Sequence, residues 1–415
     1  MSDLERIVVV GASLAGLRAC ESLRSNGFTG SVTLVGAEDH LPYDRPPLSK
    51  KVLTGEWEPD RIALRKPESI DELGLTMLLG TPAAGLHTTP AGGGAVHLAD
   101  GRTLPYDGAI IATGTSARRL PGQPAIDGAF ELRTLDDSLS LRSRLVAGAR
   151  VVVIGAGFIG LEVAAAARQR GCTVTVLEGA PAPLIRGLGP DMGLAVAAVH
   201  PENGVDLRCG VEVAAIEGAD RVTGVRLGDG SVVAADVVVV GVGVAPAVGW
   251  LADSGLELRD GIVCDATLRS VAGGNVYAAG DCVRWPHQLF DEEMRVEHWT
   301  NAAEQGAAAA TNLLHAAAGE SGEPYAAVPF FWSDQFDRRV QFLGRAFGPG
   351  ENPSDYEIRI VRGSPEEGKF VALYGRGDRL RGALGVSLPK FLMPYRNLLA
   401  RGISWSEALE FAAGQ

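Results

Sequence analysis

The sequence predicts an α/β protein that contains two similar βαβ units and ends in a smaller α+β domain. Each unit begins with a buried aliphatic run, passes through a glycine-containing turn into a helix, and returns to a second apolar run. The two turns begin at Gly11 and Gly155. A repeat at this wide separation indicates two related domains, because the repeats of a solenoid are only about 20–50 residues long.

The elements of both units follow from the period of their apolar residues. In the first unit we predict a strand at 7–10, a helix at 14–25 and a strand at 31–35. In the second unit we predict a strand at 149–154, an alanine-rich helix at 161–170 and a strand at 173–178.

Each unit is followed by a hairpin signal, in which a short turn containing Asp-Gly separates two strand-like runs. The paired runs are 95–98 with 102–106, and 222–227 with 231–234. Each half is therefore expected to combine a parallel sheet with an inserted antiparallel meander.

The last part of the chain has a different texture. Aromatic residues cluster after position 328, and the stretch 319–329 that precedes them, rich in glycine and proline, is the predicted boundary. Strand-like runs follow at 340–343, 356–361 and 370–374, and the end, 394–412, has a helical pattern. These features predict a C-terminal α+β domain.

Composition excludes several classes of function. The net charge of −12 argues against nucleic acid as a partner, and the 415 residues call for two or three domains. The longest uncharged apolar stretch, 237–252, is interrupted by glycine and proline and is shorter than the ~20 residues of a membrane-spanning helix. Because the chain also lacks the pattern of a secretory signal, we expect a cytoplasmic protein with no membrane partner.

The cysteines and the charge distribution add two expectations. The five cysteines show no C-x-x-C spacing, which predicts no disulfide framework and no metal site. Residues 326–415 contain 12 basic and 10 acidic side chains, whereas the remainder contains 26 and 40. The C-terminal domain is thus the least acidic part of the chain, either through ordinary surface variation or for a functional reason.

The second turn, GAGFIG at 155–160, has the complete pattern of a dinucleotide-binding turn. Gly155 permits the tight turn, Gly157 allows a pyrophosphate to approach the backbone, and Gly160 allows the helix to pack on the sheet. The free N–H groups at the start of the helix attract phosphate. Glu178, at the end of the next strand, is placed to bind both ribose hydroxyls and to repel a 2′-phosphate, which favours NAD over NADP.

The first turn, GASLAG at 11–16, carries Ser13 where the second has Gly157. Serine caps helices well, and its hydroxyl is able to bind a phosphate oxygen. The acid expected after the second strand is Glu38, slightly farther along the chain than usual. By itself this turn is compatible with a cofactor site or with an ordinary βα turn.

Two further segments support the cofactor interpretation. Ala112-Thr113-Gly114 ends a predicted strand just after the first hairpin, and the sequence YAAGD, which ends in Asp281, closes another. An aspartate at the carboxyl end of a strand is able to accept a hydrogen bond from a cofactor hydroxyl. The alternative for Asp281 is a helix N-cap.

The order GASLAG, ATG, GAGFIG, YAAGD resembles flavoproteins with two Rossmann-like domains, the glutathione-reductase-like fold. More narrowly, PYDRPPLSK (42–50), LRTLDD (132–137), HWTNAAEQG (298–306) and FFWSDQF (330–336) resemble the NADH-dependent ferredoxin reductases of oxygenase systems. Putidaredoxin reductase and the ferredoxin reductase of biphenyl dioxygenase belong to that group. The resemblance implies FAD and NAD(H) as cofactors.

The resemblance also implies a domain organisation. An FAD-binding domain would be formed by residues 1–115 and 245–322, an NAD(H)-binding domain by 116–244, and a C-terminal domain that covers the flavin by 326–415.

The resemblance assigns residues to each cofactor. Those expected at FAD are Gly11, Ser13, Leu14, Ala15, Gly16, Glu38, Arg45, Lys50, Ala83, Ala112, Thr113, Gly114, Arg133, Asp281, Trp299 and Trp332. Those expected at NAD are Gly155, Gly157, Phe158, Ile159, Gly160, Glu162, Glu178, Arg186 and Gly243.

Three of these residues are the candidates for a direct part in the reaction. Lys50 is expected beside the flavin ring, where a cation stabilises the anionic reduced form. Glu162 is expected near the nicotinamide carboxamide, and its alternative role is that of an acid in the first helical turn. Trp332 is expected to line the flavin, with an aromatic core position as the alternative.

The absence of a cysteine from 42–50 bears on where the electrons go. Disulfide reductases of this fold carry one or two cysteines in the aligned region, whereas here the segment contains none. Electrons are therefore expected to leave for another molecule, a 2Fe-2S ferredoxin that serves a haem-thiolate monooxygenase or a ring-hydroxylating dioxygenase. Arg338, Arg339 and Arg345 are candidates for an attractive patch on the C-terminal domain.

Two other functions remain open on the sequence alone. One is an NADH oxidase or a reductase of a small oxidant such as a quinone or the ascorbate radical. The other is a flavoprotein of the apoptosis-inducing-factor type, which acts through redox-dependent binding.

Overall fold

The computed structural model describes residues 4–89, 92–348 and 351–415, and these form two compact units. Unit 1 contains Met1–Asp44, Ile62–Ser116 and Ala245–Pro329, and unit 2 contains Arg45–Arg61, Ala117–Val244 and Phe330–Gln415. The chain therefore passes between the units several times. Within the described ranges, the helices are all too short or too polar to cross a membrane.

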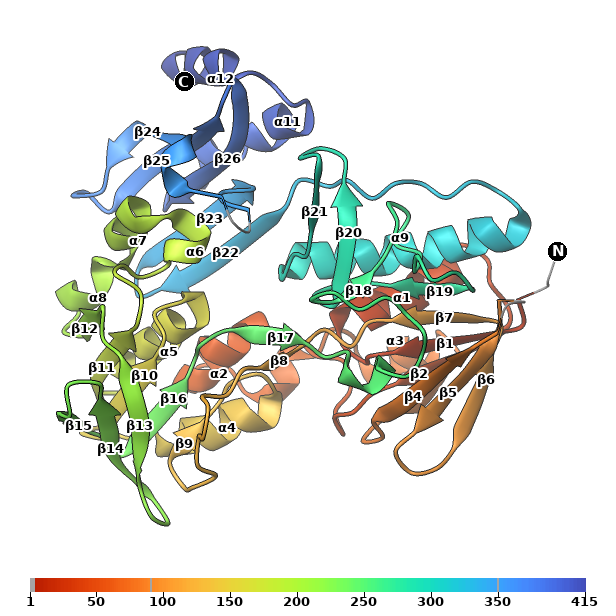
Figure 1. The fold of residues 1–415 in the computed structure, drawn as a ribbon, viewed down its shortest axis with the longest axis horizontal. Helices are drawn as coiled ribbons and strands as arrows, with labels where there is room; N and C mark the ends of the chain where they lie inside the picture. Colours follow the sequence, from red (N-terminus) through yellow and green to blue (C-terminus); the bar gives the residue numbers. More distant parts are fainter. Residues whose placement is uncertain (1–3, 90–91, 349–350) are drawn as a thin grey trace. The chain divides into compact units, whose positions relative to one another are not determined.

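A five-stranded parallel sheet forms the centre of unit 1 (Figure 1). In spatial order its strands are β19 (Val276–Ala278), β7 (Gly108–Ile111), β1 (Arg6–Val10), β2 (Ser31–Val35) and β3 (Leu75–Leu78). The predicted segment ATG follows β7 directly, YAAGD begins within β19 and continues past its end, and the first turn follows β1. Since neighbouring parallel strands end at the same edge, three predicted cofactor segments meet there.

Two helices pack against each other beside this sheet, α1 (Leu14–Ser25) and α9 (Trp299–Ala318). Unit 1 also contains α3 (Pro67–Asp71), which precedes β3 in the chain. Two small three-stranded sheets complete the unit. Their strands are β4 (Ala83–Thr88), β5 (Gly94–Leu98) and β6 (Thr103–Tyr106), and β18 (Ile262–Val263), β20 (Val283–His287) and β21 (Glu292–Met294).

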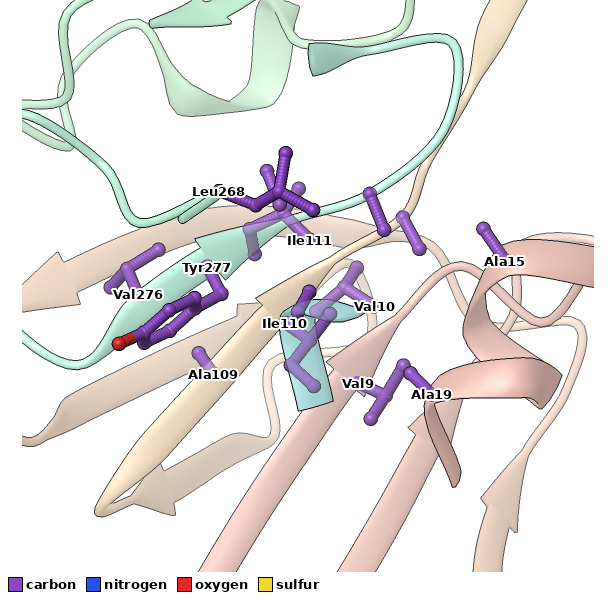
Figure 2. Close-up of a cluster of buried hydrophobic side chains, with 14 of the residues drawn as sticks. Val9, Val10, Ala15, Ala19, Ala109, Ile110, Ile111, Leu268, Val276 and Tyr277 are labelled. Atoms are coloured by element: carbon purple, nitrogen blue, oxygen red, sulfur yellow. The ribbon is translucent and has the colours of Figure 1, made fainter. Parts of the chain in front are cut away.

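The core of unit 1 explains why its strands are apolar on both faces. Figure 2 shows Val9, Ile110 and Tyr277 from three neighbouring strands within one hydrophobic cluster, together with Ala15 and Ala19 of α1. All of them are buried. Each large aliphatic side chain buried in this way stabilises the fold by about 1.5–3 kcal/mol relative to exposure, and this stabilisation holds the carboxyl edge of the sheet in place.

Unit 2 contains a second five-stranded parallel sheet. In spatial order its strands are β12 (Asp206–Cys209), β11 (Thr173–Glu178), β10 (Arg150–Ile154), β16 (Val237–Val240) and β9 (Ala129–Phe130). Helix α5 (Phe158–Gln169) follows β10 and packs on β11. An antiparallel meander of β13 (Val213–Gly218), β14 (Val222–Leu227) and β15 (Val232–Ala234) adjoins it.

Unit 2 contains further helices before its C-terminal part. They are η1 (Pro46–Ser49), α2 (Lys51–Thr54), α4 (Leu135–Arg144), α6 (Ile185–Leu188), α7 (Pro190–Ala197) and α8 (Val199–Glu202). The 3₁₀ turn η3 (Gly249–Leu251) belongs to unit 1. The 3₁₀ turn η2 (Pro59–Ile62) and the short strands β8 (Thr115–Ala117) and β17 (Val244–Pro246) lie where the chain passes between the units.

The C-terminal part of unit 2 is an antiparallel sheet with helices at its end. Its strands, in spatial order, are β22 (Phe330–Gln335), β23 (Arg338–Gly344), β26 (Arg379–Val386), β25 (Lys369–Arg376) and β24 (Tyr356–Ser364). The turn η4 (Pro353–Asp355) precedes β24, and the helices are α10 (Pro389–Leu392), α11 (Tyr395–Ala400) and α12 (Trp405–Ala413).

The structure corrects two helix predictions. The helix of the second turn begins at Phe158 rather than at position 161, because the turn itself supplies the first residues of α5. The single helix predicted at 394–412 is instead two helices, α11 and α12. Gly402 breaks the pattern with a φ of 63°, and Ser404 begins α12 with a capping box.

In each parallel sheet, an ion pair joins the beginnings of two neighbouring strands. Asp107 precedes β7 and binds Arg6 at the start of β1, with 2.7 Å between Oδ1 and Nη2. Asp236 precedes β16 and binds Arg150 at the start of β10 at 2.6 Å. The two units therefore share an Arg–Asp ion pair at the sheet edge opposite their glycine turns.

Candidate cofactor and redox sites

Of the three glycines in the second turn, only Gly157 has open space beside it. A Cβ on Gly155 would lie 2.4 Å from the carbonyl oxygen of Gly241, and one on Gly160 would lie 2.2 Å from that of Gly155. A Cβ on Gly157 would meet no atom within 4 Å. The fold itself requires the outer two glycines, whereas the space beside Gly157 fits a group from outside the chain, such as a pyrophosphate.

Glu178 lies at the end of β11 beside this turn. Its Oε2 accepts a hydrogen bond from the backbone N–H of Ala156 at 2.7 Å, and its Oε1 accepts one from Ala180 at 2.8 Å. Two backbone donors thus orient the carboxylate, and each oxygen keeps a further lone pair for a ribose hydroxyl. A negative charge fixed here disfavours a 2′-phosphate.

Other residues predicted at NAD flank the same edge. Phe158 and Ile159 open α5, and the Ile159 side chain is 43% exposed. Arg186 is exposed on α6, which starts beside the turn because the N–H of Leu184 binds the carbonyl of Ala156. Gly243 has a φ of 105°, which requires glycine.

The first turn repeats the backbone of the second. A Cβ on Gly11 would lie 2.1 Å from the carbonyl oxygen of Ala112, and one on Gly16 would lie 2.0 Å from that of Gly11. Ser13 has extended backbone at the N-cap of α1, but its side chain makes no capping hydrogen bond. The expected capping role is therefore wrong, and Ser13 occupies the position that corresponds to the open glycine. Leu14 and Ala15 are buried in the first turn of α1.

The segments that follow β7 and β19 are joined by hydrogen bonds. Thr113 Oγ1 donates to the carbonyl of Ala247 at 2.9 Å, and Thr115 Oγ1 donates to Asp281 Oδ2 at 3.2 Å. Strand β20 follows Asp281 after a turn, and no helix starts at this residue, so the N-cap alternative is wrong. Gly280 donates its N–H to Gln305 Oε1 at 2.9 Å, which ties this edge to α9.

Four more residues predicted at FAD belong to unit 1. The Tyr43 hydroxyl donates to the carboxylate of Glu38. Trp299 is the first residue of α9, and its Nε1 donates to Asp44 Oδ1 at 2.6 Å. Ala83 begins β4, away from the glycine turn in sequence, and Gly114 has a φ of 66°.

Arg45 and Arg133, which the sequence places far apart, lie together in unit 2. Arg45 Nη1 donates to the carbonyl oxygen of Arg133 at 2.7 Å. Arg133 directly precedes Thr134, the N-cap of α4, whose capping box includes Asp137. The structure therefore joins the two arginines that the resemblance assigned separately to FAD.

A buried ion pair in unit 2 contains two of the three candidate catalytic residues. Lys50 Nζ lies 2.8 Å from Glu162 Oε2, and their side chains are 15% and 5% exposed. Ser49 Oγ donates to the same Oε2 at 2.5 Å, and Ser333 Oγ donates to Oε1 at 2.6 Å. Glu162 is the fifth residue of α5 and lies outside the first turn, so the alternative of a helix-dipole acid is wrong.

The sequence reasoning missed Ser49 and Ser333. Both lie in segments that carry the family resemblance, Ser49 beside Lys50 in PYDRPPLSK and Ser333 beside Trp332 in FFWSDQF. The alternation of side chains along a strand is the feature that could have identified Ser333, because it places Ser333 on the opposite face of β22 from Trp332. The contact of Phe331 with Phe158 of α5, 4.8 Å between ring centroids, shows which face meets the helix.

Trp332 lies on the other face of β22, where it stacks on Phe330 at 6.1 Å between ring centroids. Its side chain is half-buried. Trp299 belongs to unit 1 and Trp332 to unit 2, and their predicted place beside the flavin stays a prediction.

The described cysteines are unsuited to redox chemistry. All five are free thiols, and four of them are buried. Burial raises the pKa of the Cys20 thiol to about 12 and raises the pKa of Cys172, Cys209, Cys264 and Cys282 as well. A thiol acts as a nucleophile only as its thiolate, so these residues do not supply a disulfide relay.

The three arginines predicted to form a docking patch have different surroundings. Arg338 is 20% exposed, and it donates to the carbonyls of Glu367 and Gly368 and pairs with Glu202 at 3.7 Å. Arg339 is 53% exposed and lies 3.9 Å from Asp334. Arg345 is half-buried. Arg339 is therefore the best placed of the three to meet another molecule.

Comparison with known proteins gives the family. A family model described as pyridine nucleotide-disulphide oxidoreductase matches residues 5–306, and one described as reductase C-terminal matches residues 330–411. The chain belongs to the pyridine nucleotide-disulphide oxidoreductase family.

Particular relatives resemble almost the whole chain. Rhodocoxin reductase of Rhodococcus erythropolis is 39% identical, over 95% of this chain and 89% of the relative. The anthranilate 1,2-dioxygenase system ferredoxin–NAD(+) reductase component of Burkholderia cepacia is 38% identical, over 95% of this chain and 94% of the relative. The crystal structure of the covalent putidaredoxin reductase–putidaredoxin complex matches with a TM-score of 0.87 and 33% identity, over 95% of this chain and 93% of that chain.

These matches confirm the predicted fold class and the resemblance to ferredoxin reductases. They also confirm that the protein is an oxidoreductase of the FAD- and NAD(H)-dependent type. The contacts of individual residues with either cofactor, and the predicted domain boundaries, stay predictions.

Proposed function

We propose that the protein is an NADH-dependent reductase that passes electrons through FAD to a 2Fe-2S ferredoxin of an oxygenase system. The Lys50–Glu162 pair carries this proposal most directly. In this buried ion pair, Lys50 lies in the segment where disulfide reductases of the same fold carry their cysteines. The chain thus presents a fixed cation there in place of a thiol.

The residues of unit 1 fit FAD. The first turn brings a helix N-terminus to the carboxyl edge of the sheet, Asp281 offers a carboxylate beside it, and Glu38 follows β2. These groups suit a pyrophosphate, a polyol hydroxyl and an adenosine ribose in turn. When bound, FAD accepts a hydride from NADH and releases its two electrons singly.

The residues of unit 2 fit NAD(H). The open space beside Gly157 receives the pyrophosphate, and Glu178 binds the ribose and excludes a 2′-phosphate. Lys50 places positive charge where negative charge develops on reduction, and Glu162 holds Lys50 in position. The overall reaction balances as NADH plus two oxidised ferredoxins giving NAD⁺, one proton and two reduced ferredoxins.

The acceptor is proposed from the chain's chemistry and from its relatives. The described thiols are protonated by burial, so two-electron transfer to a disulfide has no carrier. Relatives named as ferredoxin reductase components resemble the chain over nearly its full length. We also propose a cytoplasmic location, where free thiols such as these stay reduced.

Stopped-flow spectroscopy of the FAD-loaded protein tests the proposal. NADH is expected to bleach the flavin absorbance quickly, and turnover with NADH alone is expected to be slow until a 2Fe-2S ferredoxin is added. Ferricyanide serves as a control acceptor that needs no docking. Fast turnover with oxygen or a quinone, and no acceleration by a panel of ferredoxins, would instead favour an oxidase or small-oxidant reductase.

A second outcome would also overturn the proposal. Slow reduction by NADH, followed by a long-lived charge-transfer complex, would favour a redox-dependent binding protein. A preparation that takes up no FAD would contradict both cofactor assignments.

A further inference from the structure

A chain of buried polar side chains extends from Glu162 through the C-terminal strand β22 to the helix α8. Ser333 Oγ donates to Glu162 Oε1 at 2.6 Å, and Gln335 Nε2 donates to Ser333 Oγ at 3.1 Å. His200 Nε2 lies 2.9 Å from Gln335 Oε1, to which it donates. All five residues of the path from Lys50 to His200 belong to unit 2.

The residues of this hydrogen-bonded series are among the most deeply buried polar residues of the protein. Ser333, Gln335 and His200 are each 0% exposed, and Glu162 is 5% exposed. Polar groups are costly to bury unless they are hydrogen-bonded, and here each is bonded to the next. The packing of β22 alone does not account for this buried series of polar side chains, and we infer that it has a further role.

The hydrogen bonds all point the same way. Burial lowers the pKa of His200, so its imidazole is neutral and carries one N–H, which Gln335 Oε1 takes up. His200 Nδ1 is then left buried without a hydrogen-bond partner. From His200 onward, each group donates to the next, and the series ends on the Glu162 carboxylate, the one charged acceptor of the series.

The two oxygens of Glu162 have separate partners. Oε1 accepts from Ser333 of the C-terminal strand, whereas Oε2 accepts from Ser49 and binds Lys50. A rotation of the carboxylate would break both sets of contacts. Ser333 is therefore placed to fix the oxygen that Lys50 binds.

We propose that Ser333, Gln335 and His200 are positioning residues, which hold the Glu162 carboxylate in the orientation that fixes Lys50. The C-terminal strand thereby controls a cation used in the reaction. This inference rests on the proposed function in so far as Lys50 acts during flavin reduction. The positioning itself is independent of that function.

The reactivity of the Lys50 amine measures the positioning without reference to turnover. The FAD-loaded protein is treated briefly with a water-soluble acetylating reagent, and acetylation of Lys50 and Lys51 is quantified by mass spectrometry. Lys51 is an internal reference, because it is adjacent in sequence and 47% exposed. In Ser333→Ala and Gln335→Met we expect the Lys50-to-Lys51 ratio to rise at least threefold.

Matched variants separate positioning from general loosening. Ser254→Ala removes another buried serine hydroxyl, one that donates to the Leu251 carbonyl in unit 1, and is expected to leave the ratio unchanged. Ser333→Thr keeps the hydroxyl and is expected to restore the wild-type ratio. Thermal melting shows whether the variants fold, and if Ser333→Ala fails to fold, Gln335→Met decides.

Stopped-flow reduction by NADH gives the second readout. We expect the rate constant for flavin reduction to fall about tenfold in Ser333→Ala and Gln335→Met, with a lower flavin midpoint potential and unchanged FAD content. An unchanged acetylation ratio in both variants would overturn the positioning proposal. A raised ratio with an unchanged reduction rate would confirm the positioning but would overturn the inference that the C-terminal strand controls the reaction through Lys50.

These outcomes are distinct from a failure of the proposed function. If the wild-type protein is not reduced by NADH, the function is wrong, but the acetylation ratio still decides whether β22 positions Lys50.

Discussion

Glu162 accepts hydrogen bonds on both of its oxygens while it lies almost fully buried against Lys50. Charges in such a place are stable only when they are paired and hydrogen-bonded, because desolvation costs several kcal/mol for each ion. The pair is therefore weak evidence for stability and stronger evidence for function, since an apolar pair would serve the fold at least as well.

The Lys50–Glu162 pair leads to a prediction about both stability and rate. Lys50→Met leaves an uncompensated buried carboxylate and is expected to lower the free energy of unfolding by about 3 kcal/mol and to slow flavin reduction at least tenfold. Lys50→Met with Glu162→Gln is expected to recover most of the stability but none of the rate. Urea denaturation and stopped-flow reduction measure the two quantities, and recovery of the rate in the double variant would contradict the role given to Lys50.

Ser13 raises a separate question at the scale of one residue. Its side chain does not cap α1, and it stands where the second turn leaves open space. We predict that Ser13→Gly keeps FAD bound, with a dissociation constant within about tenfold of wild type, because backbone N–H groups carry most of the phosphate binding. Flavin fluorescence on dilution measures the affinity, and near-complete loss of FAD would show that the hydroxyl is itself a principal phosphate ligand.

At the scale of the elements, the two glycine turns show which contacts a βα turn needs for folding and which for binding. Gly155 and Gly160 avoid backbone clashes within the protein, whereas Gly157 avoids nothing in the chain. The contacts agree with the roles that the sequence pattern predicts for the three glycines.

A pair of alanine variants tests this division of roles. Gly160→Ala is expected to lower the free energy of unfolding by about 2 kcal/mol, since the new Cβ would press on the backbone of Gly155. Gly157→Ala is expected to keep its stability but to raise the KM for NADH at least tenfold. Thermal melting and steady-state kinetics with ferricyanide check both, and equal destabilisation by the two variants would refute the assignment.

The ion pairs at the starts of the two sheets predict a dependence of stability on pH. Hydrogen bonds from Arg150 lower the pKa of Asp236 to about 2. A carboxyl with a lowered native pKa stabilises the fold fully above its unfolded pKa of about 4, and the stabilisation is lost as the pH falls from about 4 toward 2. Asp236 is about half exposed, so the effect is expected to be modest.

Asp236→Asn is therefore expected to be less stable than wild type at pH 6, and the difference is expected to shrink by pH 3. Urea midpoints at the two pH values measure it, with the exposed Asp220→Asn as a control for loss of charge. A difference that stays constant between pH 6 and pH 3 would rule out the linkage.

At the scale of the whole molecule, the charge distribution bears on the partner. The C-terminal domain has a small excess of basic residues on a chain with a net charge of −12. An acidic ferredoxin would be steered toward such a region, and steering changes the association rate more than the affinity.

Arg339→Glu tests the steering. We expect slower reduction of an acidic ferredoxin, about fivefold at low salt and much less at high salt, with unchanged ferricyanide reduction. Arg226→Glu reverses a charge of similar exposure in the meander and serves as the control. Arg338 is a poorer choice because its guanidinium binds two backbone carbonyls. An Arg339→Glu rate equal to that of the control would remove this residue from the docking surface.

Much of the architecture could be predicted from the sequence because its signals are local. The helix at 14–25 and the strands at 31–35 and 173–178 have the predicted bounds, since their apolar period and glycine turns lie within a few residues. The helix after the second turn and the C-terminal helices were placed less well, because their starts depend on turn residues and caps. The placement of Gly155, Gly160 and Glu178 at one edge also follows from the βαβ pattern.

The sequence by itself determined two dinucleotide-type βαβ units, their glycine turns, and a segment without the cysteines of disulfide reductases. Only the tertiary structure decided that Ser49 and Lys50 from one segment and Ser333 from another, distant one meet on the Glu162 carboxylate. The physical reason is the distance along the sequence over which each kind of interaction acts. Periodicity and turn chemistry act over a few residues, whereas the partner of a buried charge is decided by which strands and helices pack around it.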